Sequence, residues 1–335
     1  MYKIGIIGCG AIFPRHLEAI EQNNNFELKA VCDIQDNLVK SIAKKLKVKA
    51  YTSYQKMIKS KEVNFVTIAT PNSLHYEQAV FALQNKCDVL IEKPVAFTKK
   101  EIKSISEIAR KNNQKAYCVL QVRLNPTIQL VKEVLKENLL GEIRGVNFIQ
   151  RWQRPLEYFS GWRAEPFIGG GTLYECGIHY LDVIQYLFGV PNIVSSKVFK
   201  TKHKNQPIED TIYSIFDWDS FGGTCEVTIA AEPQNLECSL AILGSNGYIK
   251  IGGKALNIIE SAVFLSHGSR VNYDNILKKY PYSKDPNSYG SYQGSCPNHP
   301  EVYKNLHLYD VNESSNVIDI IDKIYLKSNI KYYEP

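Results

Sequence analysis

The chain has 335 residues, a length that favours two domains over a single core or three. Its amino-acid composition is typical of a globular protein, with 44% hydrophobic and 22% charged residues, which excludes collagen, coiled-coil and low-complexity classes. The net charge of +6 is scattered and contains no block of like charges, so we expect no nucleic-acid partner, although the mild positive field suits an anionic small molecule.

Short apolar runs alternate with longer amphipathic stretches over the first 120 residues. Nearly continuous apolar runs are typical of strands that are buried on both faces of a parallel sheet. Asp36, Ser53 and Thr98 stand where helix N-caps are expected. The alternation predicts a doubly wound parallel sheet, which binds ligands at the carboxyl ends of its strands. The expected strands are residues 3–8, 27–32, 64–69, 88–91 and 116–121, and the expected helices are residues 14–22, 36–46, 53–59, 75–84 and 99–111.

The pattern changes after residue 125, where strand-like segments follow one another with few helices between them. Such a run predicts an α+β domain with a mostly antiparallel sheet and helices on one face. We therefore place a domain boundary between residues 122 and 123. The expected helices are residues 127–137, 173–188 and 315–326, the expected strands are residues 143–152, 193–199, 211–218, 223–230, 237–243, 248–251 and 256–259, and residues 266–299 carry no clear pattern.

A dinucleotide site is predicted at the first strand–helix turn. Gly8 and Gly10 allow the backbone to approach a pyrophosphate at a helix N-terminus, and Asp33 ends the second strand, where an acid accepts from the ribose hydroxyls. Phe13 replaces the small third residue of the fingerprint. The Asp33 carboxylate would repel a 2′-phosphate, which favours NAD over NADP.

Polar residues also follow the next two strands. Thr70-Pro71-Asn72 closes one strand ahead of His75, and Glu92-Lys93-Pro94 closes the following one. A lysine is most often a solvated surface residue, but the position of Lys93 at the carboxyl end of a buried parallel strand favours a functional role. The predicted cofactor-binding residues are Gly8, Gly10, Ala11, Ile12, Asp33, Thr70, Pro71, Asn72, His75, Glu92 and Lys93.

These motifs, together with Gln121-Val122-Arg123 before Pro126, Gly169-Gly170-Gly171 and Gly177-Ile178-His179 before Asp182, resemble the Gfo/Idh/MocA oxidoreductase family. The match spans almost the whole chain in the family's order. It implies an NAD-binding Rossmann domain at residues 1–122 and a substrate-binding α+β domain at residues 123–335, whose open sheet often mediates oligomers. A homodimer or homotetramer is the implied assembly.

The resemblance also implies NAD(P)-dependent hydride transfer at a CH–OH group of a sugar or cyclitol. The family's catalytic lysine falls on Lys93 and its catalytic histidine on His179, and either side chain can serve as the base that takes the hydroxyl proton. The family often has an aspartate four residues before the histidine. This chain has Glu175 there, on the same predicted helix face as His179.

The segment from Arg151 to Arg163 is rich in arginine and aromatic residues and resembles the subgroup that acts on nucleotide sugars in bacterial surface-polysaccharide synthesis, including UDP-N-acetylglucosaminuronate 3-dehydrogenases. Guanidinium groups bind diphosphates and carboxylates in bidentate fashion. Trp152, Tyr158 and Trp162 can equally serve as packing residues. The predicted substrate-binding residues are Arg123, Arg154, Arg163, Trp162, Glu175 and His179.

A polar and aromatic loop at residues 288–295, followed by Asn298 and His299, suits either a nucleotide sugar or an oligomer contact. Cys176 with His179 and Cys296 with His299 do not have zinc-finger spacing, so no metal site is expected. The eight cysteines form no CxxC pair and read as buried thiols. With no apolar run near the roughly 18 residues of a membrane span, the sequence predicts a cytoplasmic protein.

Three functions fit the sequence. The first is a dehydrogenase acting at C3 of a UDP-linked N-acetylated sugar or uronate. The second is a polyol, inositol or free-sugar dehydrogenase, which expects a small closed pocket of Asp, Asn and His. The third is a non-catalytic NAD-binding sensor. The presence of both Lys93 and His179 is evidence against a sensor.

Overall fold

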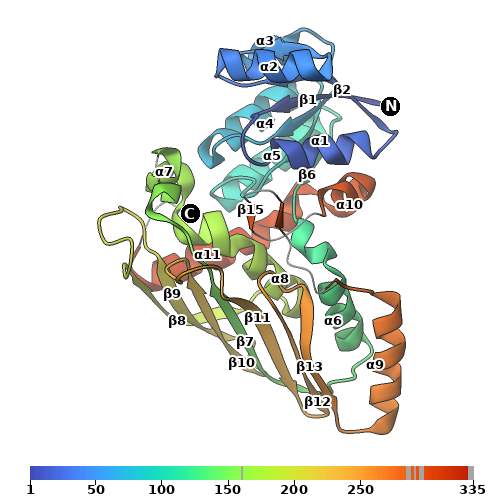
Figure 1. Cartoon of the computed structure of the whole chain (residues 1–335), viewed down its shortest axis with the longest axis vertical. Coiled ribbons are helices and arrows are strands. Elements are labelled where there is room, and N and C mark those ends of the chain that lie inside the picture. The colour runs from blue at the N-terminus through green and yellow to red at the C-terminus, as the bar shows by residue number, and fades with distance from the viewer. Residues whose placement is uncertain (160, 284–287, 290–291, 294–297, 331–335) are drawn as a thin grey trace. The chain divides into compact units, whose positions relative to one another are not determined.

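The computed structural model describes residues 1–159, 161–283, 288–289, 292–293 and 298–330, which form two compact units (Figure 1). Of the described residues, the first unit contains 1–120 and 298–318, and the second contains those from 121 to 293 together with 319–330. The sequence-based division assigns every residue after 122 to the second domain. The return of residues 298–318 to the first unit depends on tertiary contacts, which a pattern of local periodicity does not contain.

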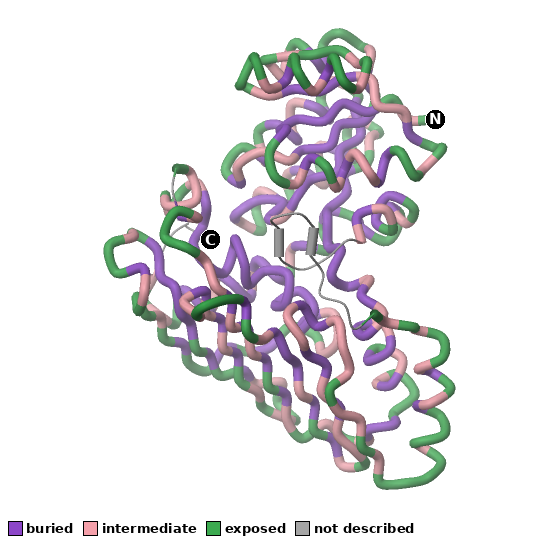
Figure 2. Tube along the Cα trace, in the orientation of Figure 1, coloured by how far each residue is buried: buried purple, intermediate pink, exposed green. Residues whose placement is uncertain are grey.

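The first unit is built on a parallel sheet that contains six of the described strands, in the order β3-β2-β1-β4-β5-β6. Its central strands are buried on both faces, in agreement with their continuous apolar runs (Figure 2). Edge strand β3 has no apolar run and was not predicted. The strands are β1 (Tyr2–Ile7), β2 (Phe26–Cys32), β3 (Lys49–Tyr51), β4 (Phe65–Ile68), β5 (Asp88–Ile91) and β6 (Ala116–Cys118).

The helices of this unit begin where the caps predict, with one exception. Ser53 accepts from the backbone N–H of Lys56, and Thr98 forms a capping box with Glu101. The prediction of Asp36 as an N-cap was wrong: Gln35 is the cap, and Asp36 is the first helical residue, paired with Lys40. The helices are α1 (Phe13–Glu21), α2 (Asp36–Leu46), α3 (Tyr54–Lys59), η1 (Asn72–Leu74), α4 (His75–Gln84) and α5 (Lys99–Lys111).

Two anchors attach the C-terminal segment to this unit. The Cys118 N–H at the end of β6 donates to the Tyr309 carbonyl at 2.9 Å, so the edge of the parallel sheet is met by a later part of the chain. Helix α10 packs against α1. The segment contains α10 (His299–Lys304), η6 (Leu306–Leu308) and η7 (Val311–Ser314), and it leads into α11 (Ser315–Lys327).

The second unit contains a sheet of seven described strands in the order β13-β12-β11-β7-β10-β9-β8. Only the β7–β10 pair within that sheet is parallel. Alternate residues of its strands are buried, and Figure 1 shows helices on one of its faces. The strands are β7 (Ile143–Arg151), β8 (Asn192–Phe199), β9 (Thr211–Asp217), β10 (Gly222–Thr228), β11 (Glu237–Gly244), β12 (Gly247–Gly252) and β13 (Ile258–Phe264).

The helix expected at residues 173–188 is interrupted. Its first turn is a π-helix, η5 (Leu173–Gly177), and α8 (Ile178–Phe188) continues it. Such turns often occur at functional sites. The other elements of this unit are η2 (Gln121–Leu124), α6 (Pro126–Lys136), η3 (Leu156–Phe159), η4 (Gly161–Ala164), α7 (Pro166–Gly169), α9 (His267–Lys279), β14 (Ser288–Tyr289) and β15 (Tyr292–Gln293).

Two further differences concern residues 256–279. The strand expected at residues 256–259 begins at Ile258, because Leu256 has a φ of +54° and the Asn257 N–H closes a turn onto the Gly252 carbonyl. The unassigned stretch after residue 266 contains α9, whose N-cap Ser266 accepts from the Ser269 N–H at 3.0 Å. The polar composition of α9 concealed it.

Within the residues that the structure describes, no helix has the length and apolar character to cross a bilayer. Seven of the eight cysteines lie in this part of the chain, are buried, and form no disulfide there. Cys296 lies outside the described residues.

Candidate active site

The turn after β1 fits a role in holding a pyrophosphate. Gly8 has a φ of +96°, and a Cβ atom there would lie 2.3 Å from the Ala69 carbonyl oxygen, so only glycine fits. A Cβ on Gly10 would meet nothing within 4 Å. Ala11 is exposed and Ile12 half-buried before α1 begins at Phe13. The turn therefore presents accessible backbone at a helix N-terminus, as an anionic ligand requires.

Asp33 lies directly beside this turn. Its Oδ2 accepts from the Cys9 N–H and its Oδ1 from the Gln35 N–H, both at 2.9 Å. The two bonds fix the carboxylate against the glycine turn at the end of β2. This is the position from which an acid reaches the ribose hydroxyls of a dinucleotide.

His75 joins the loops that follow β4 and β5. Its ring is fully buried, with Nδ1 2.6 Å from the Pro94 carbonyl oxygen and Nε2 2.9 Å from the Thr70 carbonyl oxygen. Thr70 also donates from its hydroxyl to Gln78 at 2.8 Å. One imidazole thus connects the predicted cofactor loop at Thr70 to the Lys93-Pro94 segment.

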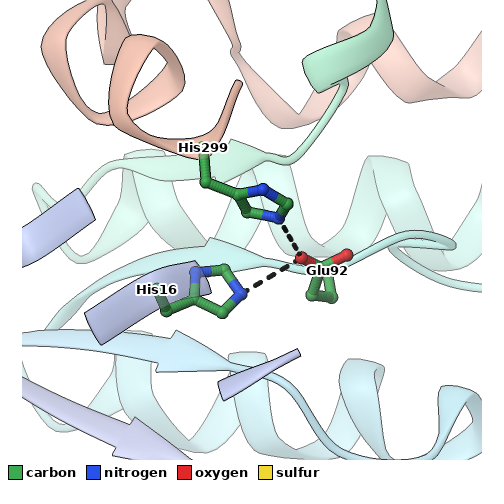
Figure 3. Close-up of side chains that lie close together, drawn as sticks. All are labelled: His16, Glu92 and His299. Atoms are coloured by element: carbon green, nitrogen blue, oxygen red, sulfur yellow. Dashed lines mark hydrogen bonds and ion pairs between the residues drawn. The ribbon is translucent and has the colours of Figure 1, made fainter. Parts of the chain in front are cut away.

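Glu92 is the centre of a buried network that Figure 3 shows. His16 and His299 both place Nε2 3.1 Å from its Oε1 atom, and its Oε2 accepts from the Lys93 N–H at 3.1 Å. The Tyr303 hydroxyl lies 3.1 Å from His16 Nδ1. The carboxylate therefore receives three hydrogen bonds, which offset the cost of removing it from water.

Sequence reasoning placed Glu92 in the cofactor site but missed its partners. The sequence does not mark His16 as a candidate, and it assigns His299 to a segment that suits either a nucleotide sugar or an oligomer contact, whereas His299 is buried against Glu92. The adjoining residues 294–297 lie outside the described residues. No local signal links His16 to His299, because distant parts of the chain supply them.

In the second unit, Glu175 is buried on the π-turn η5, four residues before the buried His179 at the start of α8. Its Oε1 accepts from the Tyr158 hydroxyl and from Arg163 Nε, each at 3.0 Å. Burial, and then the negative charge of Glu175, raise the pKa of Tyr158 well above its usual range. Tyr158 therefore stays a hydrogen-bond donor to this carboxylate at all physiological pH values.

In the segment from Arg151 to Arg163, arginine side chains pack against aromatic rings. The Arg163 guanidinium lies 4.4 Å from the Trp162 ring centroid and 5.0 Å from that of Tyr158. Arg154 lies 4.7 Å from the Trp152 ring, which is itself buried. Stacking of this kind holds guanidinium planes in place. Trp152 therefore has a packing role, and binding of a substrate anion by Arg154 and Arg163 stays a prediction.

Arg123 forms a buried ion pair within the second unit. Its Nε and Nη2 donate to the two oxygens of Asp182 at 2.8 and 2.7 Å, and its guanidinium lies 4.9 Å from the Tyr186 ring. The pair ties η2 to α8, the helix that carries His179. Asp182 neutralises the Arg123 guanidinium, which the sequence predicts to bind a substrate anion. Arg123 therefore has a structural role in addition to any ligand that it binds.

The structure thus groups the predicted cofactor residues, with Lys93, in the first unit, and the predicted substrate residues, with His179, in the second. Two family models match the chain, "Oxidoreductase family, NAD-binding Rossmann fold" over residues 2–120 and "GFO/IDH/MocA C-terminal domain" over residues 128–250. Together they match more than half of it. The chain belongs to the Gfo/Idh/MocA oxidoreductase family. The first unit is accordingly an NAD-binding domain of this family.

Individual proteins and solved structures are also similar to this chain. Two crystal structures of WlbA dehydrogenases, each in complex with NADH and UDP-GlcNAcA, are 26% identical to this chain and cover 98% of it. The Bordetella pertussis structure has a TM-score of 0.82 over 96% of its own chain, and the Chromobacterium violaceum structure 0.86 over 94%. D-glucoside 3-dehydrogenase of Escherichia coli is 29% identical over 200 residues, which are 58% of this chain and 56% of that protein.

We expect the Asp182→Asn substitution to lower the free energy of unfolding by about 3 kcal/mol, because it leaves the Arg123 guanidinium without its buried counter-charge. Urea denaturation followed by circular dichroism measures the change. Asp219→Asn, at an exposed position of the same unit, is the matched control and should have no effect. Equal stability of the two variants would contradict the importance of the ion pair.

The Glu92 network predicts a pH dependence of stability. Burial alone raises the pKa of Glu92, but the hydrogen bonds from His16 and His299 outweigh it and hold the pKa well below its usual 4.5. A carboxylate with a lowered pKa stabilises the fold above pH 4.5, and this contribution is lost as the pH falls through the folded-state value.

The difference in unfolding free energy between the native protein and Glu92→Gln should therefore be constant near neutral pH and shrink on acidification. Urea titrations at a series of pH values measure it. Glu21→Gln, at an exposed position of α1, should show no such pH-dependent difference. A Glu92→Gln difference that is independent of pH would refute the lowered pKa.

Proposed function

We propose that this chain is an NAD-dependent dehydrogenase that oxidises a secondary alcohol of a sugar, at C3 of a UDP-linked N-acetylated sugar or uronate. The observation that carries the substrate class is the likeness, over 98% of the chain, to two dehydrogenases crystallised with NADH and UDP-GlcNAcA. The reaction would belong to bacterial surface-polysaccharide synthesis.

The described residues fit an NAD molecule. The open backbone at Gly10 would face the pyrophosphate, and Asp33 would accept from the adenosine ribose and disfavour the 2′-phosphate of NADP. When bound, NAD supplies the acceptor for the hydride that leaves the sugar carbon. The task left to the protein is to bind the sugar and to take the proton from its hydroxyl.

Lys93 and His179 are the two residues proposed for that proton. Lys93 follows the buried carboxylate at the end of β5, with its backbone N–H bonded to Glu92. His179 begins α8 directly after the π-turn that carries Glu175. Glu175 and Arg163 would provide an acceptor and a donor for the sugar, since a carboxylate and a guanidinium together bind hydroxyl and acidic groups.

A second candidate substrate is a glycoside without a nucleotide, favoured by the 29% identity to D-glucoside 3-dehydrogenase. The two substrates place different demands on the second unit. A nucleotide sugar needs basic side chains for its diphosphate, and Arg154 and Arg163 are the side chains proposed to bind it, whereas a simple glycoside has no diphosphate for them to bind.

We also infer that copies of this chain form a homodimer or homotetramer through the open face of the seven-stranded sheet. Large apolar side chains on that face are about half exposed: Phe199, Tyr213, Ile215, Leu243 and Val263. Exposed apolar side chains on one sheet face fit such an interface. The measured mass in solution decides between a monomer and an oligomer.

Titration of the protein and NAD with UDP-N-acetylglucosaminuronate, a methyl glucoside and myo-inositol tests the substrate class. Nicotinamide absorbance reports turnover, and tryptophan fluorescence reports binding. We expect a response to the nucleotide sugar at micromolar to low millimolar concentration. A response only to the glucoside or the inositol would contradict the nucleotide-sugar assignment and support the second candidate, and silence with all three would contradict both.

The Lys93→Ala variant should lose at least ~10²-fold in turnover, because it removes the proposed acid–base group. NAD binding, followed by fluorescence, should persist in this variant. Lys100→Ala, at an exposed position on α5, is the matched control with unchanged turnover. Retained turnover in Lys93→Ala would remove this lysine from the mechanism.

A further inference from the structure

We propose that His16, His299 and Tyr303 are positioning residues for Lys93: they hold the Glu92 carboxylate, and this carboxylate holds the Lys93 backbone. The inference deepens the proposed function and rests on the role of Lys93 within it. Nothing in the motif Glu92-Lys93-Pro94 by itself indicates the three distant side chains.

The two oxygens of Glu92 have separate tasks. Oε1 faces the imidazoles of His16 and His299, and Oε2 accepts from the N–H of Lys93. Because a carboxylate is planar, fixing Oε1 also fixes the direction in which Oε2 points. The Lys93 peptide is therefore oriented by two imidazoles that do not touch it.

The segment is held from the other side as well. The Pro94 carbonyl oxygen lies 2.6 Å from the Nδ1 atom of buried His75. The backbone is thus held on both sides of the Lys93 side chain, by the Lys93 N–H at Glu92 and by the Pro94 carbonyl at His75. With the backbone held, only the four side-chain torsions of Lys93 decide where its amine lies.

The hydrogen positions follow from the partners. A carboxylate only accepts, so Nε2 of His16 and of His299 each carry the hydrogen that faces Glu92. In a neutral His16 ring the Nδ1 atom must then accept, which makes the Tyr303 hydroxyl its donor at 3.1 Å. Thr67 in turn donates to the Tyr303 oxygen at 2.8 Å. The hydrogen bonds run in one direction, from Thr67 through Tyr303 and His16 to Glu92, an arrangement in which neighbouring bonds strengthen one another.

Burial supports this arrangement. His16 is 0% exposed, His299 1% and Glu92 6%. Burial raises the pKa of Tyr303, which keeps its hydroxyl protonated and able to donate. The rings of His16 and His299 also meet edge to face, with centroids 5.1 Å apart. The network is therefore closed to bulk solvent and packed, so its bonds have little freedom to rearrange.

The C-terminal segment is essential to this network. His299 and Tyr303 are four residues apart on α10 and so share one face of that helix, which packs against α1, the helix of His16. The return of residues 298–318 to the first unit brings His299 to Glu92 and Tyr303 to His16. This gives the segment a task in addition to covering the edge of β6.

The test compares His299→Leu, which removes the donor to Glu92, with His299→Gln, whose amide can donate in its place. Tyr303→Phe removes only a hydroxyl and keeps the packing, so it decides the matter should His299→Leu fail to fold. His307→Leu, at an exposed position of the same segment, is the matched control. Circular dichroism establishes that each variant is folded.

Two measurements separate positioning from a general loss of stability. The first is kcat, which should fall at least ~10-fold in His299→Leu and by less in Tyr303→Phe, with recovery in His299→Gln, while the Kd for NAD changes little. The second is hydrogen exchange of the Lys93 amide, followed by mass spectrometry on peptides that span it. Exchange should accelerate there in His299→Leu and Tyr303→Phe, and stay unchanged in peptides of β2 and in His307→Leu.

The outcomes are distinguishable from failure of the proposed function, because amide exchange needs no substrate. Native exchange at Lys93 in both His299→Leu and Tyr303→Phe would overturn the inference. So would one equivalent of tightly bound zinc per chain that is lost in His299→Leu, since His16, Glu92 and His299 would then be metal ligands and not hydrogen-bond partners. Unchanged turnover in Lys93→Ala would overturn the catalytic role of Lys93, whereas the exchange result would still stand.

Discussion

A carboxylate that is removed from water must be met by hydrogen-bond donors, and the first unit is organised around that requirement at Glu92. Two imidazoles and one backbone N–H meet it, and they come from α1, from α10 and from the residue that follows Glu92. The same bonds fix the segment that begins at Lys93. The stability of a buried charge and the placement of a proposed catalytic group therefore have one physical cause.

The parallel sheet explains why so many polar groups meet in one region. The carboxyl ends of its parallel strands all lie on one side of the sheet. The glycine turn after β1, Asp33 after β2, Thr70 after β4 and Glu92 after β5 therefore lie on that side. Hydrogen bonds then connect the neighbouring turns. Asp33 accepts from the backbone of the glycine turn, and the two ring nitrogens of His75 lie 2.6 and 2.9 Å from carbonyl oxygens of the next two loops. The region proposed to bind NAD is therefore ordered by its own polar contacts.

The second unit uses paired charges for the same purpose. Asp182 fixes Arg123 beneath the helix of His179, and Glu175 accepts from Tyr158 and Arg163 on the π-turn. Each charge in these sets has a partner within the unit, which keeps buried charges compatible with a folded protein. Glu175 in place of the family's usual aspartate is long enough to reach both donors.

The sequence by itself determined the alternation of strands and helices, the glycine turn with its acid, and the Glu92-Lys93-Pro94 motif, because each depends on neighbours in the chain. Periodicity predicted both sheets and most of their strands, and the family resemblance that the motifs carried was confirmed. Two predictions failed because local polarity is a poor guide. Helix α9 shows no strong apolar face and was not predicted, and Asp36 was predicted as an N-cap although its neighbour Gln35 is the cap.

Only the tertiary structure decided which distant residues meet. The pairing of His16 and His299 at Glu92 joins residues from opposite ends of the chain, and the covering of β6 by Tyr309 places a late segment in the first unit. The pairing of Arg123 with Asp182 likewise gives a predicted substrate-binding cation a buried counter-charge. Such contacts depend on where whole elements pack, and side-chain spacing along the chain carries no record of that packing.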